Sequence, residues 1–307
     1  MDYDETLHRV LTELRRTTGL ELEIRADSPE EKSRAAEQLR LLTAAYKEKY
    51  DKIHFLRSLM TGELPAYRIQ EHACRFHIAF AEPRILYLVE AEQKPDDLLQ
   101  EVLRGLLPSR TAAYLIPVSG NLTAVLCSRG CMVKDGQGSP ELAFARTMVD
   151  MLNAEAFTRI RVSYSRVSES LADLSAAFQE TGLALKIGKL FFSGETVFPC
   201  GRLGVGRLIY GLPYELCENF LREIFGEDIP PELDEETAVT ASQFFENNLN
   251  IAETARQLHV HRNTLIYRLE QIQNRTGLDL RRFEDAAAFK IATMVINYLR
   301  TERNQNA

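Results

Sequence analysis

The sequence lacks an uninterrupted apolar run long enough to cross a membrane, and it has no charged-then-apolar leader. A transmembrane helix needs about 20 predominantly apolar residues, and a secretory signal needs a short apolar core behind positive charges. We therefore expect neither a membrane anchor nor export. The cytoplasm is the predicted location of this 307-residue chain, whose 45% apolar and 26% charged residues are ordinary for globular domains.

Cysteine is scarce as well. The five cysteines are odd in number and scattered, whereas a disulfide framework uses an even set at short spacings. We therefore predict reduced thiols that serve mainly as small buried apolar residues. They are Cys74, Cys127, Cys131, Cys200 and Cys217.

Positive charge is in deficit, with 37 Lys and Arg against 44 Asp and Glu and a net charge of −7. The balance is uneven, because residues 251–300 carry eight basic and five acidic side chains, a local excess of three positive charges. Phosphate contacts depend on charges within a Debye length of about 8 Å. The C-terminal part is therefore compatible with DNA, and the acidic remainder predicts modest affinity for a single copy, which a dimer would raise.

The segment 250–272 is the most informative part of the chain. Asn250 can cap a first helix, with Glu253 completing a capping-box-like pair, and Ile251, Ala255 and Leu258 follow at helical spacing. This pattern indicates the first helix of a helix-turn-helix.

A second helix is predicted to begin near Arg262. Leu265, Leu269 and Ile272 would face inward, while Val260 fills the corner between the two helices. The opposite, polar face at the start of this helix is where a recognition helix contacts DNA.

Seven side chains are predicted to contact double-stranded DNA. Arg pairs with guanine, Asn with adenine, and Thr or Tyr with a thymine methyl or a phosphate, while Arg268 and the two histidines of the corner would contact the backbone. The alternative is an ordinary helical hairpin with solvated arginines, but the apolar spacing and the polar first turn together favour recognition. The seven residues are His259, His261, Arg262, Asn263, Thr264, Tyr267 and Arg268.

The same segment resembles the C-terminal domain of PucR/CdaR-type bacterial transcriptional regulators. That family carries HRNT-x-x-YRL followed by T-G-x-D-L, and this chain has these letters at 261–264, 267–269 and 276–280. The helix pair is also similar to the DNA-binding unit of Fis-like proteins, whose Arg-x-Thr-Leu start matches Arg262, Thr264 and, in the core, Leu265. The resemblance implies a sequence-specific, dimeric transcriptional regulator with an inverted-repeat operator, which could also contact RNA polymerase.

A final amphipathic helix over 285–299 would complete the bundle.

A mixed domain is expected between the breaks at 61–65 and 225–234, which are rich in Gly, Pro and acids. The pattern predicts strands over 84–90, 111–118, 122–127 and 160–164, and helices over 96–106, 139–156 and 168–187. This β-α-β-β-α-β-α order predicts a ferredoxin-like sheet backed by helices on one face. The segments 168–174 and 184–188 resemble the GGDEF-like domain of the same regulators.

The chain is therefore predicted to be an α+β multidomain protein. Its domains would be an N-terminal helical or dimerisation segment over 1–64, a degenerate GGDEF-like domain over 65–228 and an all-α helix-turn-helix domain over 232–307.

An enzymatic activity is not expected. True GGDEF domains hold metal with carboxylates, but the hairpin over 116–123 contains no acid, and Glu90 and Glu92 end the first strand as solvated residues. We predict no catalytic residue, cofactor or metal. The alternative is a nucleotide-handling or effector-binding GGDEF-like protein whose helix-turn-helix docks a partner.

Three further motifs are weak. The glycines of 201–207 lack the Gly-Lys-Ser/Thr ending of a phosphate loop and favour a turn. His72, Cys74 and His77 point in different directions on a helix, so a metal site is not favoured. A redox pair of Cys127 and Cys131 has no supporting pattern.

The first 62 residues are shorter than the sensor domain that many members of the family carry for a small metabolite, so control by such an effector stays open. We expect a helix over 4–17, a strand over 20–24 and a long helix over 29–60. The long helix has an approximate heptad seam, which favours a coiled-coil dimer stem over packing on the middle domain. The seam residues are Ala35, Leu39, Leu42, Tyr46, Ile53, Leu56 and Met60.

Overall fold

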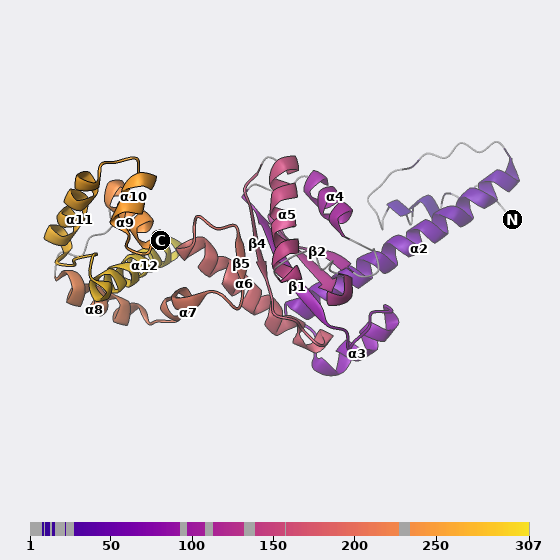
Figure 1. Cartoon of the computed structure of the whole chain (residues 1–307). Helices are drawn as coiled ribbons and strands as arrows, with labels where there is room; N and C mark the ends of the chain where they lie inside the picture. Colours follow the sequence, from indigo (N-terminus) through magenta and orange to yellow (C-terminus); the bar gives the residue numbers. More distant parts are fainter. Residues whose placement is uncertain are drawn as a thin grey trace. The chain divides into compact units, whose positions relative to one another are not determined.

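The structure is a computed structural model (Figure 1). It describes residues 28–92, 97–107, 113–131, 139–156, 158–226 and 234–306, together with 8, 10–12, 14, 15 and 22 near the N-terminus. The chain forms two compact units, one of residues 1–185 with 196–201 and the other of residues 186–195 with 202–307. None of the helices in the described ranges has the length and apolar character needed to cross a membrane.

The first unit is built on a five-stranded sheet with the order β2-β3-β1-β4-β5. Neighbouring strands are antiparallel, except that β4 and β5 are parallel. The first four strands and their helices follow the predicted ferredoxin-like order, and β5 is an addition. The strands are β1 (Arg84–Ala91), β2 (Ala113–Ser119), β3 (Leu122–Ser128), β4 (Ile160–Tyr164) and β5 (Val197–Pro199).

Helices cover both faces of the sheet, so the expectation of helices on one face was wrong. On one face, Tyr87 and Val89 pack with Leu103 of α4 (Asp97–Leu106) and Met148 of α5 (Pro140–Ala156). On the other face, the Ser163 hydroxyl donates to the carbonyl of Thr181 in α6 (Leu174–Phe191) at 2.9 Å. Successive residues of β1 are buried, as expected for a strand covered on both sides.

The long helix α2 runs over Pro29–Met60, as predicted. Ser28 caps it in a capping box with Glu31, whose backbone N–H donates to the Ser28 hydroxyl at 3.2 Å. A short helix, α3 (Ala66–Arg75), follows the predicted break. The predicted strand over 20–24 and most of the helix over 4–17 lie outside the described residues.

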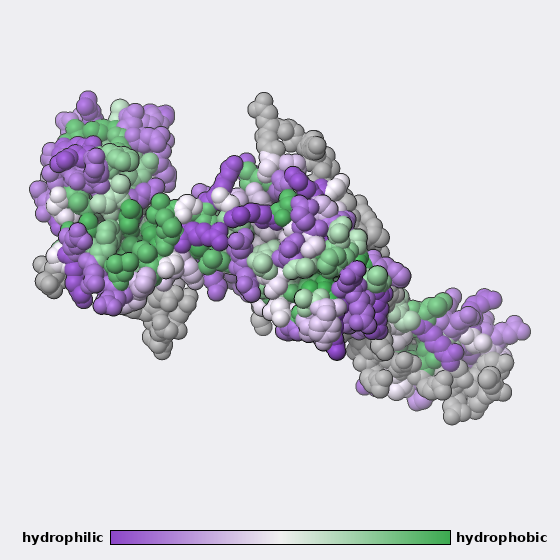
Figure 2. Space-filling view, turned by 90° about the horizontal axis from the view of Figure 1, so that it is seen from below, coloured by the Kyte–Doolittle hydropathy of each residue, from purple (hydrophilic) through white to green (hydrophobic). Residues whose placement is uncertain are grey.

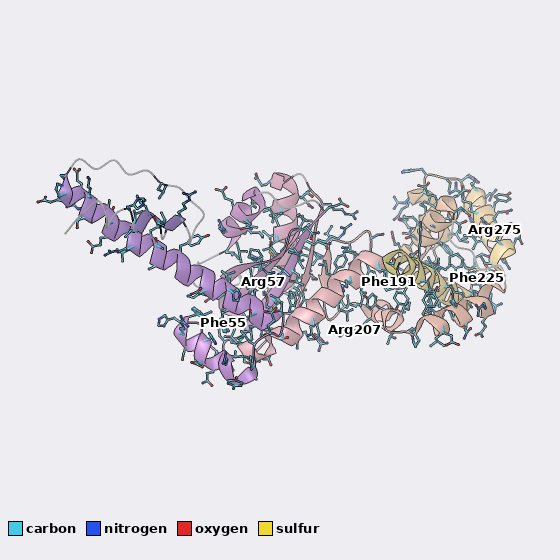
Figure 3. All side chains as sticks on the ribbon, turned by 180° about the vertical axis from the view of Figure 1, so that it is seen from behind. Phe55, Arg57, Phe191, Arg207, Phe225 and Arg275 are labelled. Atoms are coloured by element: carbon cyan, nitrogen blue, oxygen red, sulfur yellow. The ribbon has the colours of Figure 1, made fainter. Side chains whose placement is uncertain are left out.

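The apolar residues of α2 have different surroundings along the helix. Near its C-terminal end Phe55 and Met60 are buried, and the Arg57 guanidinium donates to the carbonyl of Val118 in β2 at 3.2 Å (Figure 3). Leu39 packs on residues of the N-terminal segment, whereas Leu42 is exposed. The last turns of α2 therefore pack on the middle domain, and a coiled-coil stem stays a prediction.

The second unit is helical in its described part. Its elements, besides the end of α6, are α7 (Gly204–Tyr210), α8 (Tyr214–Phe225), α9 (Glu235–Glu246), α10 (Ile251–Gln257), α11 (Arg262–Thr276) and α12 (Phe283–Asn306). Hydrophobic areas also reach its surface (Figure 2), and Leu208 of α7 and Leu216 of α8 are among the exposed residues.

α12 contributes to two hydrophobic cores of this unit. Phe289 packs with Phe244 and Leu269, whereas Val295 packs with Leu221 of α8. The amphipathic helix predicted over 285–299 is therefore confirmed, and it extends further at both ends. α8 thus packs on α12 although it precedes the predicted boundary at 228–232. The domain limits stay predictions.

Candidate nucleic-acid interface

The first helix of the predicted helix-turn-helix is α10, and Asn250 caps it as expected. The Asn250 Oδ1 accepts hydrogen bonds from the backbone N–H groups of Ala252 at 3.0 Å and Glu253 at 3.1 Å. The Glu253 carboxylate pairs with Arg256 rather than with the cap residue. The interaction is therefore a simple N-cap and not the predicted capping-box-like pair.

The turn between α10 and α11 is formed by His259, Val260 and His261. His259 has a left-handed backbone with φ of 53°, and its N–H donates to the carbonyl of Arg256 at 3.2 Å. Val260 packs into the core at the corner, as predicted. His261 caps α11, because its Nδ1 accepts from the N–H of Asn263 at 3.2 Å. His261 therefore shapes the start of α11.

The inner face of α11 is fixed by three buried residues at the predicted positions. Leu265, Leu269 and Ile272 are at most 2% exposed and pack in one cluster with Phe244 and Phe289. The helix ends at Gly277, whose φ of 78° makes the left-handed cap that glycine favours. Leu280 of the T-G-x-D-L turn is buried in the same cluster. Because these residues hold the inner face of α11 in the core, the opposite face of the helix is exposed to solvent.

The outer face of α11 presents the predicted reading residues. Arg262, Asn263 and Thr264 are exposed in the first turn, and Tyr267 is 61% exposed one turn further on. The first N–H groups of a helix have no intrahelical partners and attract anions. Donors, a guanidinium and an aromatic ring therefore lie together on one accessible surface.

Arg268 lies in surroundings that the sequence did not reveal. Its side chain is 25% exposed, with Nη2 at 2.8 Å from the Glu236 carboxylate and Nη1 at 3.5 Å from the Thr240 hydroxyl, both of α9. Its predicted contact with the DNA backbone stays a prediction, and an internal carboxylate already binds this guanidinium.

A second ion pair joins the same two helices. Asp234 caps α9 by accepting from the backbone N–H of Thr237 at 2.8 Å and from its hydroxyl at 3.0 Å, and it also binds Arg275 in the last turn of α11 (Figure 3). The Thr237 hydrogen bonds, followed by that of Arg275, lower the pKa of Asp234 to about 2. Both ion pairs line a groove of about 380 Å³ between α9 and α11.

The weaker sequence motifs have structural roles. The glycine-rich segment 201–207 is only partly the turn that was expected, because Gly204, with φ of 51°, begins α7 and residues 204–207 are helical. The His72 ring stacks on Phe55 at 5.5 Å between centroids. Within the described ranges no three His, Cys, Asp or Glu side chains are grouped in a way that could hold a metal ion. The side chain of Cys131 lies outside those ranges.

The hairpin of β2 and β3 is closed by backbone and amide contacts. Pro117 pairs with Thr123, the register shifts between Pro117 and Ser119, and the Asn121 side chain donates to the carbonyl of Ala91 at 3.3 Å. Residues 116–123 of this hairpin include no carboxylate.

α10, the tight turn and α11, whose inner face is buried in the helical bundle, together form a helix-turn-helix. Comparison with known families agrees: residues 238–295 match the PucR C-terminal helix-turn-helix domain, and residues 61–187 match the GGDEF-like domain. The two matches agree with the two domains that the sequence motifs indicated.

Two curated relatives are regulators. The purine catabolism regulatory protein of Bacillus subtilis (strain 168) is 27% identical over 152 residues, which are 49% of this chain and 29% of that protein. The carbohydrate diacid regulator of Escherichia coli (strain K12) is 22% identical over 263 residues, 83% of this chain and 68% of that protein. The chain therefore spans less than a third of the first relative and about two thirds of the second.

Solved structures were also compared with the chain. The regulator of polyketide synthase expression from Bifidobacterium adolescentis aligns with a TM-score of 0.35 and 18% identity, over 81% of this chain and 92% of that one.

Replacing His259 by Gly should stabilise the protein by about 0.5–1 kcal/mol, because the left-handed backbone strains a residue with a Cβ. Urea unfolding followed by circular dichroism measures this. The matched control is Asn248→Gly, at an exposed position with φ of 52°, where the gain should be smaller because Asn tolerates this conformation. A His259→Gly variant less stable than the wild type would show that the imidazole holds the turn.

Proposed function

We propose that the chain is a cytoplasmic, sequence-specific DNA-binding transcriptional regulator that reads the major groove with the first turns of α11. The observation that carries this proposal is the division of α11 into a buried face and an exposed polar face at its N-terminus. The PucR-type domain and the two relatives named as regulators support the same function.

The reading residues have distinct roles in this proposal. Arg262, Asn263, Thr264 and Tyr267 contact base edges or the neighbouring phosphates, since their side chains are accessible. His259 and His261 lie at the corner, from which the DNA backbone would be reached. The His261 cap leaves its ring on the surface, where its free edge can meet a phosphate oxygen.

Replacing Arg262 by Ala should weaken binding to the cognate site by about 1–3 kcal/mol, the contribution of one good bidentate base contact. Fluorescence anisotropy on a fragment selected from the source genome measures this affinity. Because Arg262 is exposed, the circular dichroism spectrum should not change. Arg222→Ala in α8 removes the same charge far along the sequence from α11 and should leave the affinity unchanged. Equal affinities of the Arg262 variant and the wild type would contradict the proposal.

The regulator binds as a homodimer to an inverted repeat. A dimer of helix-turn-helix units contacts two half-sites about 34 Å apart, which compensates for the modest affinity of one unit in an acidic chain. The exposed Leu41, Leu42 and Tyr46 of α2 are apolar surface that a second copy could cover. In footprinting we expect two protected half-sites, and in sedimentation two chains per operator. One chain on one unpaired half-site would exclude this arrangement.

The GGDEF-like domain has a scaffolding or effector-binding role and no catalytic one. Its support is the hairpin over 116–123, which offers no carboxylate for Mg²⁺, and the description of both relatives as regulators. Incubation of the full chain with GTP and Mg²⁺ should therefore leave GTP intact. Formation of a cyclic dinucleotide, detected by mass spectrometry, would refute this role.

A further inference from the structure

We infer that Asp234 and Glu236 of α9 act as internal counter-ions for Arg275 and Arg268 of α11, so that these two arginines position the recognition helix and do not contact DNA phosphates. We call these four residues the α9–α11 clamp. Where it concerns DNA, the inference rests on the proposed function and refines it, because it assigns neither Arg268, which was predicted to contact the DNA backbone, nor Arg275 to phosphate contacts.

Arg268 forms the first ion pair of the clamp, with Glu236. Its guanidinium reaches the Glu236 carboxylate at 2.8 Å and the hydroxyl of Thr240, a residue that is fully buried. The next residue, Leu269, is buried in the core. The guanidinium of Arg268 is therefore held against α9 by two of its side chains. A phosphate could take this guanidinium only by displacing the carboxylate.

Arg275 is bound at the other end of the clamp. Its partner Asp234 is fixed by the Thr237 backbone N–H and hydroxyl, because it caps α9 at the same time. These hydrogen bonds keep the pKa of Asp234 near 2, so the carboxylate is charged at neutral pH. One carboxylate thus starts α9 and holds the last turn of α11.

The clamp changes the charge that α11 offers to DNA. The helix contains Arg262, Arg268 and Arg275, and the clamp neutralises the last two with carboxylates. Glu236 is itself 66% exposed in its side chain, so it would repel a phosphate that approached this flank. Arg262 is then left as the cation of α11 with no acidic partner among the described residues. The phosphate attraction of α11 is concentrated at its first turn, next to the reading residues.

The salt dependence of binding to nonspecific duplex DNA tests this inference in the full chain. Each phosphate contact contributes about 0.9 to the slope of log affinity against log salt concentration. We expect Arg268→Ala and Arg275→Ala to leave the slope unchanged. Glu236→Gln and Asp234→Asn should each steepen it by up to about 0.9, because an arginine is released. Asn caps a helix as well as Asp does, so Asp234→Asn keeps the start of α9.

A fall in slope of about 0.9 in either arginine variant would overturn the inference, since that arginine would contact a phosphate in the wild type. Arg262→Ala is measured in parallel on the selected operator. If Arg268→Ala lowers the slope while Arg262→Ala weakens operator binding, the clamp fails and the proposed function stands.

A double-mutant cycle of Arg268→Met and Glu236→Gln in urea unfolding tests the clamp without DNA. The expected coupling is about twofold to fivefold in the unfolding equilibrium constant, typical of a partly exposed ion pair. Additive effects would overturn the clamp. If the wild type binds no DNA at all, the proposed function fails, and this coupling alone decides whether the clamp exists.

Discussion

The burial of Leu265, Leu269 and Ile272 is the interaction on which the C-terminal unit depends. Each such side chain contributes about 1.5–3 kcal/mol when it leaves water, and together they fix the rotation of α11 about its axis. That rotation decides which residues point outward. The polar side chains at the start of α11 face solvent because the apolar side chains on the opposite face of the helix are held in the core.

Local polar contacts refine what the core determines. Asn250 and His261 begin the two helices of the motif, and the left-handed His259 lies in the turn between them. The α9–α11 ion pairs then hold the flank of the recognition helix. The hydrophobic core thus specifies which face of α11 is exposed. The helix caps specify where that face begins, and the ion pairs specify which of its arginines are already bound to a carboxylate.

Elements with a strong local pattern could be predicted from the sequence, and those that depend on distant partners could not. The spacing of Leu265, Leu269 and Ile272 identified α11, and the run from Arg84 identified β1. The strand β5 has three residues, too few to show a period. Asp234 and Arg275 are 41 positions apart, and an acid at a helix start has an ordinary local explanation, so nothing in the sequence pointed to their pairing. The same holds for helices on both faces of the sheet, although the unbroken apolar run of β1 was a signal for it.

The helix α12 passes through both cores of the C-terminal unit. Phe289 belongs to the helix-turn-helix core, and Val295, less than two turns later, belongs to the core shared with α8. A straight helix cannot rotate or slide at one end without moving the other. The packing of α8 and the packing beneath α11 therefore share one helix, and neither core can be repacked along α12 without affecting the other.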